Sequence, residues 1–378
     1  MKILWICGSR IVGGAERVTM QILGLLRQRA HRVAAICPHG SDLVRALAAA
    51  GISASPTNLG GSLNVFALGS IRRALRRERP DIAMVTTPDE WVWSSLVPRR
   101  SLGTSLVLVR HMALRLPATV RWLANLRADA IVAVSEAARS NLISSAGIRR
   151  DRVHVISNPV RFAVRGSVPT RDERSQARAS LGLRPDGRLI GFFGGMEKKK
   201  GIDDVLRAAR RIGEEMGECN VLVCGRDVKD VGARDGERAA AYHLNGCVHY
   251  LGEIEEVERA LTACDAIAVA THSTLSEGLS LVSLEAMACG IPVAAYATGG
   301  VIEAIGEEGT AGLLAAPDDP DDLARRLMKL LGDPEGAARV AGQALVRARL
   351  RFDAQAAVDK YESLFSSLCT GEPSALYE

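Results

Sequence analysis

The sequence has few aromatic residues and no cysteine pair with the spacing of a metal or redox motif. Aromatic residues make up 4% of the 378 residues, which argues against a nucleic-acid partner. The eight cysteines are scattered, and no two of them form a C-x-x-C motif. We therefore interpret the cysteines as small core hydrophobes in a reducing compartment.

A long apolar run is also absent. The longest uncharged stretch, residues 46–71, contains Gly51, Pro56, Gly60 and Gly61, and a membrane-spanning helix is not built from such residues. The apolar start at residues 2–7 is too short for a signal peptide. We expect a cytoplasmic chain, with the inner face of the plasma membrane as a surface on which it could dock.

Length and composition indicate two globular domains. The chain has 47% hydrophobic and 24% charged residues, and 378 residues exceed one ordinary core. The net charge of +5 hides an asymmetry. Residues 1–165 contain 24 basic and 9 acidic side chains, whereas residues 166–378 contain 24 basic and 34 acidic ones. Halves of opposite charge suggest different partners, with an anionic partner for the first half.

Short apolar runs alternate with helical segments throughout the chain. They predict strands at residues 2–7, 32–37, 80–86, 105–109 and 130–134, and again at 189–193, 221–223, 248–251, 266–269 and 292–295. This alternation predicts parallel sheets that are covered on both faces.

The expected domain boundaries follow from breaks in this pattern. A polar stretch at residues 164–178 interrupts it and is the expected linker. Residues 353–368 have the spacing of an amphipathic helix. We expect domains at residues 1–165 and 166–350, followed by a terminal helical segment at residues 351–378.

The first segment that could bind an anion runs from Gly8 to Glu16, between a strand and a helix. Gly13 and Gly14 would let the backbone approach a ligand, and the helix N-terminus offers N–H groups. A tight strand-to-helix turn explains the same residues. Because the segment lacks the G-x-G-x-x-G fingerprint, a nicotinamide cofactor is not indicated.

The second segment places Lys198, Lys199 and Lys200 between glycines, directly after a strand. Gly194 and Gly195 precede the lysines and Gly201 follows them. Open α/β sheets bind ligands at the carboxyl ends of their strands, and clustered lysines favour an anion there. A solvated run of charges is the alternative.

The third segment contains two carboxylates, Glu277 and Glu285, on either side of a helix start near Leu281. The amides of Leu281 and Val282 would face a phosphate at the helix N-terminus. Glu285 lies one turn further along, where it could accept hydrogen bonds from a diol. Spacing alone is a weak signal, and the surrounding motifs strengthen it.

Taken in order, these segments resemble family-4 retaining glycosyltransferases, group 1 glycosyltransferases of the GT-B fold. The resemblance rests on residues 13–17, 194–201, the Glu277 and Glu285 pair with the tail that ends at Pro292, and Gly299-Gly300. It covers nearly the whole chain. It implies two Rossmann-like α/β domains whose parallel sheets face each other across a cleft, with a terminal helix that crosses back to the N-terminal domain.

The resemblance also implies roles for individual residues. Lys200 would neutralise the donor diphosphate, Glu277 would contact the donor sugar and Glu285 would hold the ribose hydroxyls. His111 would reach the transferred sugar, although a histidine after a strand can equally be structural. The expected catalytic residues are His111, Lys200 and Glu277. The expected nucleotide-sugar-binding residues are Gly13, Gly14, Gly194, Gly195, Lys199, Lys200, Ser280, Leu281, Val282 and Glu285.

The implied reaction retains the anomeric configuration and uses no metal or other cofactor. A nucleotide sugar is the donor, and we favour UDP over GDP because UDP-sugars are commoner. The leaving diphosphate would take the proton of the acceptor hydroxyl, so catalysis would consist of positioning and electrostatic stabilisation.

Three motifs depart from the pattern of the family: the arginine position at Gly195, Asn158-Pro-Val-Arg161 in place of Asn-Gly-Val-Asp, and Glu277-Gly-Leu-Ser280 in place of Glu-Gly-Phe-Gly. Gly195 stands where an arginine is usual, and Lys198 or Lys199 could supply that cation. Arg161 and Ser280 also replace the usual aspartate and glycine. These departures concern the donor diphosphate, the linker and the sugar pocket.

Arginines account for the basic character of the first half, in which Lys2 is the only lysine before residue 166. One group decorates a helix, and a second follows the strand before His111. The groups are Arg72, Arg73, Arg76, Arg77 and Arg79, and Arg110, Arg115, Arg121 and Arg127. A basic surface with interleaved apolar residues suits an anionic membrane leaflet. A solvated helix face is the alternative.

The expected function is therefore a peripheral hexosyltransferase that acts on a lipid-linked or cell-envelope saccharide, of the lipopolysaccharide core or exopolysaccharide type. A glycosyltransferase that acts on a soluble anionic small molecule is the first alternative. A nucleotide-sugar epimerase and a non-catalytic nucleotide-sugar-binding subunit on the same fold are the others.

Overall fold

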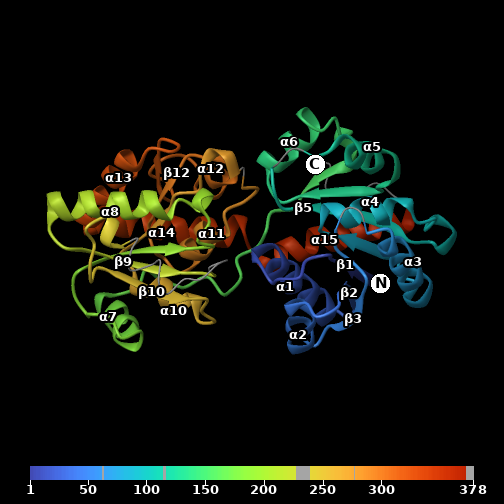
Figure 1. Cartoon of the computed structure of the whole chain (residues 1–378), viewed down its shortest axis with the longest axis horizontal. Helices are drawn as coiled ribbons and strands as arrows, with labels where there is room; N and C mark the ends of the chain where they lie inside the picture. Colours follow the sequence, from blue (N-terminus) through green and yellow to red (C-terminus); the bar gives the residue numbers. More distant parts are fainter. Residues whose placement is uncertain (62–63, 114–115, 227–238, 276, 372–378) are drawn as a thin grey trace. The chain divides into compact units, whose positions relative to one another are not determined.

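The computed structural model describes residues 1–61, 64–113, 116–226, 239–275 and 277–371, and the chain divides into two compact units. The first unit is Met1–Pro159 together with Ala354–Glu378, and the second is Val160–Asp353 (Figure 1). The expected boundaries were residue 165 and residue 350. The C-terminal segment thus belongs to the same unit as the N-terminus.

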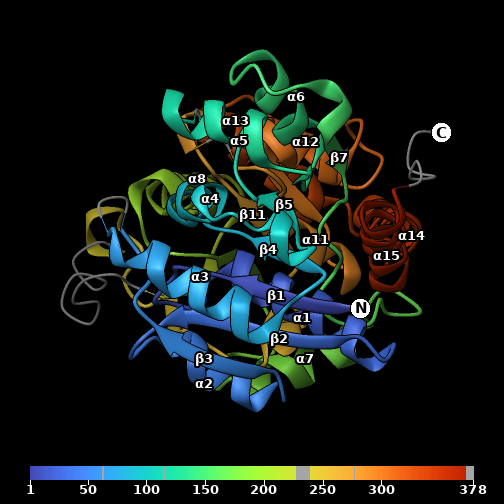
Figure 2. The same ribbon diagram turned by 90° about the vertical axis from the view of Figure 1, so that its right-hand side faces the viewer.

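The first unit contains a parallel sheet of seven strands in the order β3-β2-β1-β4-β5-β6-β7. Figure 2 shows the successive strands from β3 to β5. The strands are β1 (Lys2–Ile6), β2 (Arg32–Pro38), β3 (Ser53–Thr57), β4 (Ile82–Val85), β5 (Ser105–Arg110), β6 (Ala130–Ala133) and β7 (Val153–Val155). Strands β3 and β7 were not expected, because β3 lacks an apolar run and β7 has only three residues.

Helices cover both faces of this sheet. They are α1 (Gly14–Gln28), α2 (Asp42–Ala49), α3 (Phe66–Glu78), α4 (Pro88–Leu96), α5 (Ala118–Arg127), α6 (Glu136–Ser144) and α15 (Ala354–Thr370). One core cluster joins the sheet to buried residues of α3, α4, α5 and α6. Helix α15 packs on α1, where Arg29 forms ion pairs with Asp359 and Glu362 and His31 lies 2.6 Å from Glu362.

The second unit contains a parallel sheet of six strands in the order β10-β9-β8-β11-β12-β13. The strands are β8 (Arg188–Phe193), β9 (Cys219–Cys224), β10 (Val248–Gly252), β11 (Ala266–Val269), β12 (Val293–Tyr296) and β13 (Leu313–Ala315). The helices are α7 (Arg171–Ser180), α8 (Ile202–Met216), α10 (Val257–Ala263), α11 (Leu281–Ala288), α12 (Gly299–Ile305), α13 (Pro320–Gly332) and α14 (Pro334–Arg351). The expectation of two α/β units with parallel sheets is confirmed.

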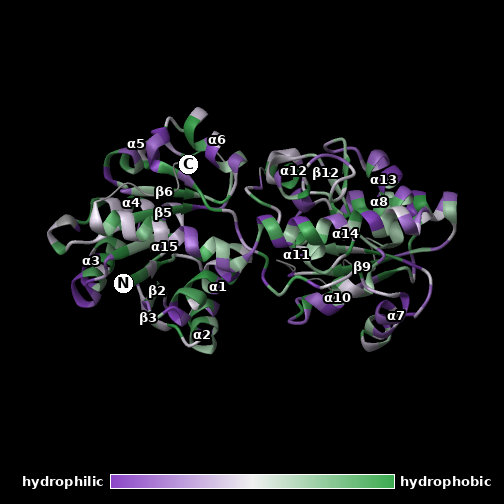
Figure 3. Cartoon of the chain, turned by 180° about the vertical axis from the view of Figure 1, so that it is seen from behind, coloured by the Kyte–Doolittle hydropathy of each residue, from purple (hydrophilic) through white to green (hydrophobic). Residues whose placement is uncertain are grey.

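Alternating strand residues of this second sheet enter two separate core clusters. One cluster packs against α8 and α13, and the other packs against α7, α10, α11 and α12. Figure 3 shows the apolar strands in green, with purple polar turns on α3, α10 and α13. Six of the eight cysteines are buried, as expected, whereas Cys247 is half-buried and Cys369 is exposed. All eight are free thiols.

The expected linker at residues 164–178 was partly wrong, because α7 begins inside it at Arg171. The side chain of Thr170 accepts a hydrogen bond from the Glu173 amide at 3.2 Å, and the Glu173 carboxylate accepts one from the Thr170 amide at 2.8 Å. This reciprocal pair is a capping box, which starts a helix even in a polar sequence. Charge and polarity alone therefore misidentified the segment.

Both sheets reverse their winding at one point, and these points position the candidate sites. In the first sheet, β2 and β4 pair with opposite edges of β1. In the second sheet, β9 and β11 pair with opposite edges of β8. Loops leave in opposite directions at such a point, so a crevice forms outside the carboxyl ends of the two central strands.

None of the helices in the described part of the chain is long and apolar enough to cross a bilayer.

Candidate functional site

An ammonium and a carboxylate meet at the winding reversal of the second sheet. Lys200 ends the loop after β8, and Glu277 follows β11. Lys200 Nζ donates a hydrogen bond to Glu277 Oε1 at 2.8 Å, and the two side chains are 25% and 20% exposed. The structure thus brings together two residues that the sequence proposed for the same site.

A glycine fixes the path of the loop that carries Lys198, Lys199 and Lys200, which we call the lysine loop. Gly201 adopts φ +76° at the start of α8, in the left-handed region that favours glycine. A Cβ at this position would lie 2.1 Å from the carbonyl oxygen of Ala270, so a side chain would push the loop away from the end of β11. Gly201 therefore holds Lys200 close to the segment that leads to Glu277.

Two further contacts hold Glu277. Its Oε2 accepts a hydrogen bond from Thr271 Oγ1 at 3.1 Å, and its carbonyl oxygen accepts one from the amide of Gly300 at 3.1 Å. A Cβ at Gly300 would lie 1.9 Å from the carbonyl oxygen of Gly278. The Gly299-Gly300 pair is thus needed for close contact between two backbone segments.

Helix α11 begins beside the Lys200–Glu277 pair. Ser280 caps the helix, and its buried Oγ accepts hydrogen bonds from the amide and the hydroxyl of Ser283 at 3.4 and 2.9 Å. Leu281 and Val282 occupy the first turn, where amides lack intrahelical partners. Lys200, Glu277, Ser280 and Val282 line one small hollow, which therefore combines a cation with a helix N-terminus.

Gly194, Gly195 and Lys199 lie in the loop that leads to Lys200. Gly194 has φ +151°, and its amide donates to the carbonyl of Cys224 at 2.9 Å. A Cβ at Gly195 would lie 3.2 Å from the Glu197 carboxylate. The side chain of Lys199 is exposed, and its carbonyl accepts a hydrogen bond from the amide of His272.

Glu285 lies one turn along α11 and pairs with a residue whose contact was not foreseen. Arg161 Nε lies 3.2 Å from Glu285 Oε1, and the side chains are 24% and 15% exposed. In the sequence, Arg161 stands out only as a departure from the family pattern at the linker. The sequence could not signal this contact, since the two residues lie in separate segments of the second unit.

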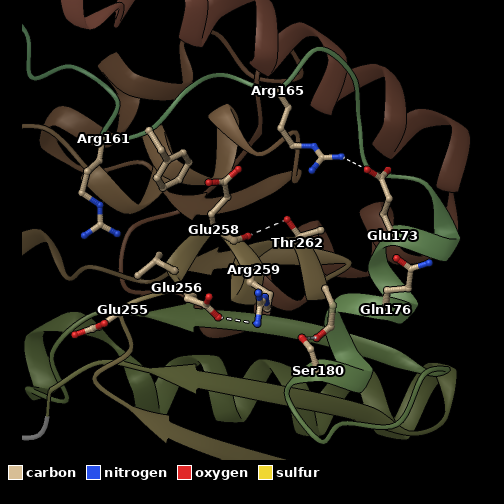
Figure 4. Close-up of a pocket in the computed structure, with 13 residues that line it drawn as sticks. Arg161, Arg165, Glu173, Gln176, Ser180, Glu255, Glu256, Glu258, Arg259 and Thr262 are labelled. Carbon is tan, nitrogen blue, oxygen red and sulfur yellow. Dashed lines mark hydrogen bonds and ion pairs between the residues drawn. The ribbon is translucent and has the colours of Figure 1, made fainter.

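A cavity of about 760 Å³ adjoins Arg161 (Figure 4). Arg161 and Arg165 come from the segment before α7, and Glu256 and Arg259 come from the region of α10. Arg165 forms an ion pair with Glu173, and Arg259 Nη1 lies 2.7 Å from Glu256. The remaining lining residues are Phe162, Gln176, Ala177, Ser180, Glu255, Val257, Glu258 and Thr262. The cavity is polar and presents both donors and carboxylates.

In the first unit, the loop after β1 packs against a buried carboxylate that the sequence analysis missed. Glu90, 1% exposed, accepts hydrogen bonds from the Gly60 amide at 2.9 Å and from Thr87 Oγ1 at 2.5 Å. Burial raises the pKa of Glu90. A Cβ at Gly8 would lie 2.3 Å from the Glu90 carboxylate oxygens, so glycine is required there.

The same loop ends at Gly13, which precedes α1. The Gly13 amide donates to Glu16 Oε2 at 2.9 Å, and Gly14 is the first helical residue. The helix N-terminus expected at these two glycines is therefore present.

His111 follows β5 at the same edge of the first sheet. Both of its ring nitrogens are buried and have no hydrogen-bond partner among the residues that the structure describes. Burial, helped by the neighbouring charge of Arg110, lowers the pKa of His111 to about 4. The imidazole is thus neutral at pH 7 and offers one donor and one acceptor.

The two arginine groups differ in exposure. Arg72, Arg73, Arg76, Arg77 and Arg79 are exposed on and just after α3, as expected for a basic surface. In the second group, Arg110 is only 6% exposed, and burial lowers its pKa to about 10. The interpretation of Arg110 as a surface cation was therefore wrong. Arg115 lies outside the described residues.

Within the described ranges, the structure shows no group of three or more His, Cys, Asp or Glu side chains that could hold a metal ion.

Two family models match the chain. The model of glycosyl transferases group 1 matches residues 173–345, and that of glycosyltransferase family 4 matches residues 12–163. The D-inositol 3-phosphate glycosyltransferase of Stackebrandtia nassauensis is 32% identical over an alignment of 234 residues, which covers 57% of this chain and 51% of that relative. The chain spans about half the length of the curated relatives it matches.

Solved structures with the same fold cover almost the whole chain. The Anabaena protein HepE in complex with UDP-glucose has a TM-score of 0.83 and 25% identity, over 97% of this chain and 100% of HepE. The lipopolysaccharide outer core galactosyltransferase WaaB has a TM-score of 0.72 and 16% identity, over 97% and 100% of the two chains. At 16% identity the likeness shows the fold alone.

The low pKa of His111 predicts a loss of stability in acid. The unfolded chain protonates this histidine near pH 6.5 and the folded chain only near pH 4, so stability is lost as the pH falls through this window. Between pH 7 and pH 4.5, the free energy of unfolding of the wild type should fall by about 2–3 kcal/mol more than that of H111Q. Urea unfolding at the two pH values measures this difference.

Substitution of the exposed His39 in H39Q serves as the control and should leave the acid loss of the wild type unchanged. Equal acid losses in the wild type and H111Q would contradict a buried neutral imidazole.

Proposed function

Because the chain belongs to the family 4 and group 1 glycosyltransferases of the GT-B fold, we propose that it transfers a hexosyl group from a nucleotide sugar with retention of configuration. The observation that carries this proposal is the pair of Lys200 and Glu277 beside the N-terminus of α11, at the winding reversal of the second sheet. A cation and a helix N-terminus at such a point favour a diphosphate.

The two charges of the Lys200–Glu277 pair would then have different partners during turnover. Lys200 would bind the diphosphate, whose negative charge increases as the bond to the sugar breaks. Glu277 would accept hydrogen bonds from hydroxyls of the donor sugar. The amides of Leu281 and Val282 would stabilise the same phosphate charge, without reorganisation at the moment of reaction.

Glu285 and the neighbouring cavity would hold the nucleoside. The carboxylate of Glu285 can accept hydrogen bonds from both ribose hydroxyls. Arg161 both contacts Glu285 and lines the cavity of about 760 Å³ (Figure 4), so a nucleoside held at Glu285 has a polar cavity beside it. We propose a UDP-sugar, which is supported by the complex of HepE with UDP-glucose.

The chemistry would proceed without a metal ion. The bond between C1 of the sugar and the diphosphate oxygen breaks, and the acceptor oxygen bonds to C1 on the same face. The proton of the acceptor hydroxyl passes to the departing diphosphate. Neutral His111 would hydrogen-bond a hydroxyl of the transferred sugar, for which its two unpartnered nitrogens are suited.

For the acceptor, we propose a lipid-linked or cell-envelope saccharide presented at an anionic membrane. The support is α3, which carries the exposed arginines and at whose start Val65 and Phe66 are 62% and 73% exposed. Apolar residues beside arginines bind the interface of an anionic leaflet. The proposed location is the inner face of the plasma membrane.

A soluble anionic acceptor is the second candidate. The curated relatives are named for D-inositol 3-phosphate, a small phosphorylated acceptor. The basic first half would attract such an acceptor as well. The two candidates differ in whether the arginines of α3 meet lipid or solvent.

Donor binding tests the site directly. We expect UDP-sugars to raise the unfolding temperature of the wild type more than GDP-sugars do. Replacement of Lys200 in K200A should lower the rate of UDP release about 100-fold, because the departing diphosphate loses its cation. Replacement of Glu285 in E285A should raise the donor Kd about tenfold, because two hydrogen bonds to a carboxylate are lost.

The exposed residues Lys329 and Glu335 provide the matched controls K329A and E335A, which should behave as the wild type. Unaltered kinetics in both K200A and E285A would contradict the assignment of this site. Conversion of a UDP-sugar with no acceptor present would indicate an epimerase, and binding without any turnover would indicate a non-catalytic subunit.

Transfer should continue in EDTA, because Lys200 and the N-terminus of α11 supply the positive charge that the diphosphate needs. The measurement is the initial rate of UDP release before and after dialysis against EDTA. Activity that disappears in EDTA and returns with manganese would contradict the proposed mechanism.

Membrane binding should depend on the arginines of α3. The triple substitution R72E/R73E/R76E should weaken sedimentation with vesicles of phosphatidylcholine and phosphatidylglycerol by about 100-fold or more, at about 1 kcal/mol per basic residue. Wild-type binding should also fall steeply with salt.

The control R171E/R339E/R351E changes the same charge at exposed positions of the second unit. Absence of wild-type binding to these vesicles, together with transfer to inositol 3-phosphate, would favour the soluble acceptor.

A further inference from the structure

A buried carboxylate near the lysine loop receives two hydrogen bonds on one oxygen. Asp204 Oδ2 lies 2.9 Å from His272 Nε2 and accepts a hydrogen bond from Tyr296 OH at 2.9 Å. Asp204 is 8% exposed and Tyr296 is fully buried. Burial and the charge of Asp204 raise the pKa of Tyr296 well above its usual value, so the phenol remains a donor. We call Asp204, His272 and Tyr296 the carboxylate cluster.

Each member of the cluster comes from a different segment of the second unit. Asp204 lies in the first turn of α8, His272 follows β11, and Tyr296 ends β12. Two donors stabilise the buried carboxylate, which would otherwise be costly to remove from water. The cluster therefore ties three loops together at the carboxyl edge of the sheet.

Each of these three segments also carries a contact of the Lys200–Glu277 pair. The segment of Asp204 begins with Lys200 itself, four residues earlier. The segment of His272 contains Thr271, which donates to Glu277 Oε2, and ends at Glu277. The segment of Tyr296 leads to Thr298 and Gly300, which donate to Thr271 O and Glu277 O at 3.2 and 3.1 Å.

The backbone links the cluster to the lysine loop a second time. The amide of His272 donates to the carbonyl of Lys199 at 2.9 Å, and the amide of Asp204 donates to the carbonyl of Gly201 at 3.1 Å. Lys200 thus lies between two backbone groups that are held by cluster residues. If the carbonyl of Lys199 or of Gly201 lost its hydrogen bond, the backbone at Lys200 would no longer be fixed. The position of Lys200 Nζ would then depend on a flexible side chain of four methylenes.

We propose that Asp204, with His272 and Tyr296, is a positioning residue that holds Lys200 and Glu277 in the geometry needed to bind the donor diphosphate. This inference rests on the proposed function. The cluster acts through Lys200 and touches no substrate. Loss of the carboxylate cluster should therefore weaken binding of the terminal phosphate of the donor diphosphate and leave binding of the nucleoside unchanged.

The test compares binding of UDP and UMP by calorimetry in the full chain. D204N should lower the preference for UDP over UMP about tenfold, with the UMP affinity and the unfolding temperature close to those of the wild type. H272A should behave in the same way, and H272Q, whose amide can still donate to Asp204, should recover most of the preference. If D204N does not fold, the two His272 variants carry the test.

Asp322 provides a matched control. It lies in the first turn of α13, its side chain is 13% exposed against 11% for Asp204, and it accepts a hydrogen bond from the Ala316 amide at 2.7 Å. D322N should leave the UDP preference unchanged. An equal loss of UDP and UMP binding in D204N and D322N would show a general structural role and overturn the inference.

A double-mutant cycle shows whether the cluster acts through Lys200. If it does, K200A/D204N should bind UDP no more weakly than K200A alone. Additive effects of the two substitutions would overturn the inference while leaving the proposed function intact. A wild-type chain that binds neither UDP nor GDP would overturn both. If guanosine is preferred, GDP and GMP replace UDP and UMP.

Discussion

The arrangement of the second unit depends on one ion pair between Lys200 and Glu277, 2.8 Å apart and about three quarters buried. Partly buried charges are costly unless they have partners, and Thr271 gives the second oxygen of Glu277 a hydrogen bond. The parallel sheet makes this possible because it delivers the ends of β8 and β11 to adjacent positions. The close approach of the backbone at Gly201 and Gly300 then follows as a requirement of the pair.

Each carboxylate of the site has its own cation, and this resolves an apparent conflict in the charge of the chain. The second half has ten more acidic than basic residues, yet its proposed ligand is a diphosphate. Lys200 neutralises Glu277 and Arg161 neutralises Glu285, so the two site carboxylates do not repel an incoming phosphate as free charges would. The electrostatic field at the hollow is therefore determined by these local ion pairs and not by the net charge of the domain.

The sequence proposed Lys200 and Glu277 for one site, and the structure brings these two residues of separate motifs together, but the sequence contained no signal for contacts that involve residues outside the motifs. Five strands in each half were found from apolar runs, and Leu281 was correctly expected near the start of a helix. Arg161 and Glu285 are far apart in the chain, as are Asp204 and Tyr296, and no local periodicity connects such pairs. The start of α7 is different, because its capping residues Thr170 and Glu173 were readable and were outweighed by polarity.

Only the exposed arginines of the first half can bind a partner, so the buried ones must be set apart first. Arg99 is 2% exposed and its Nη2 lies 2.7 Å from Asp129, and Arg110 is buried as well, so both serve the interior of the fold. Five exposed arginines lie on and just after α3, whose apolar side, including Ile71 and Leu75, is committed to the core. An anionic partner that binds α3 meets Val65 and Phe66 exposed at the start of that helix. Other exposed cations, such as Arg127, and exposed apolar residues, such as Trp122, lie on the same unit outside α3.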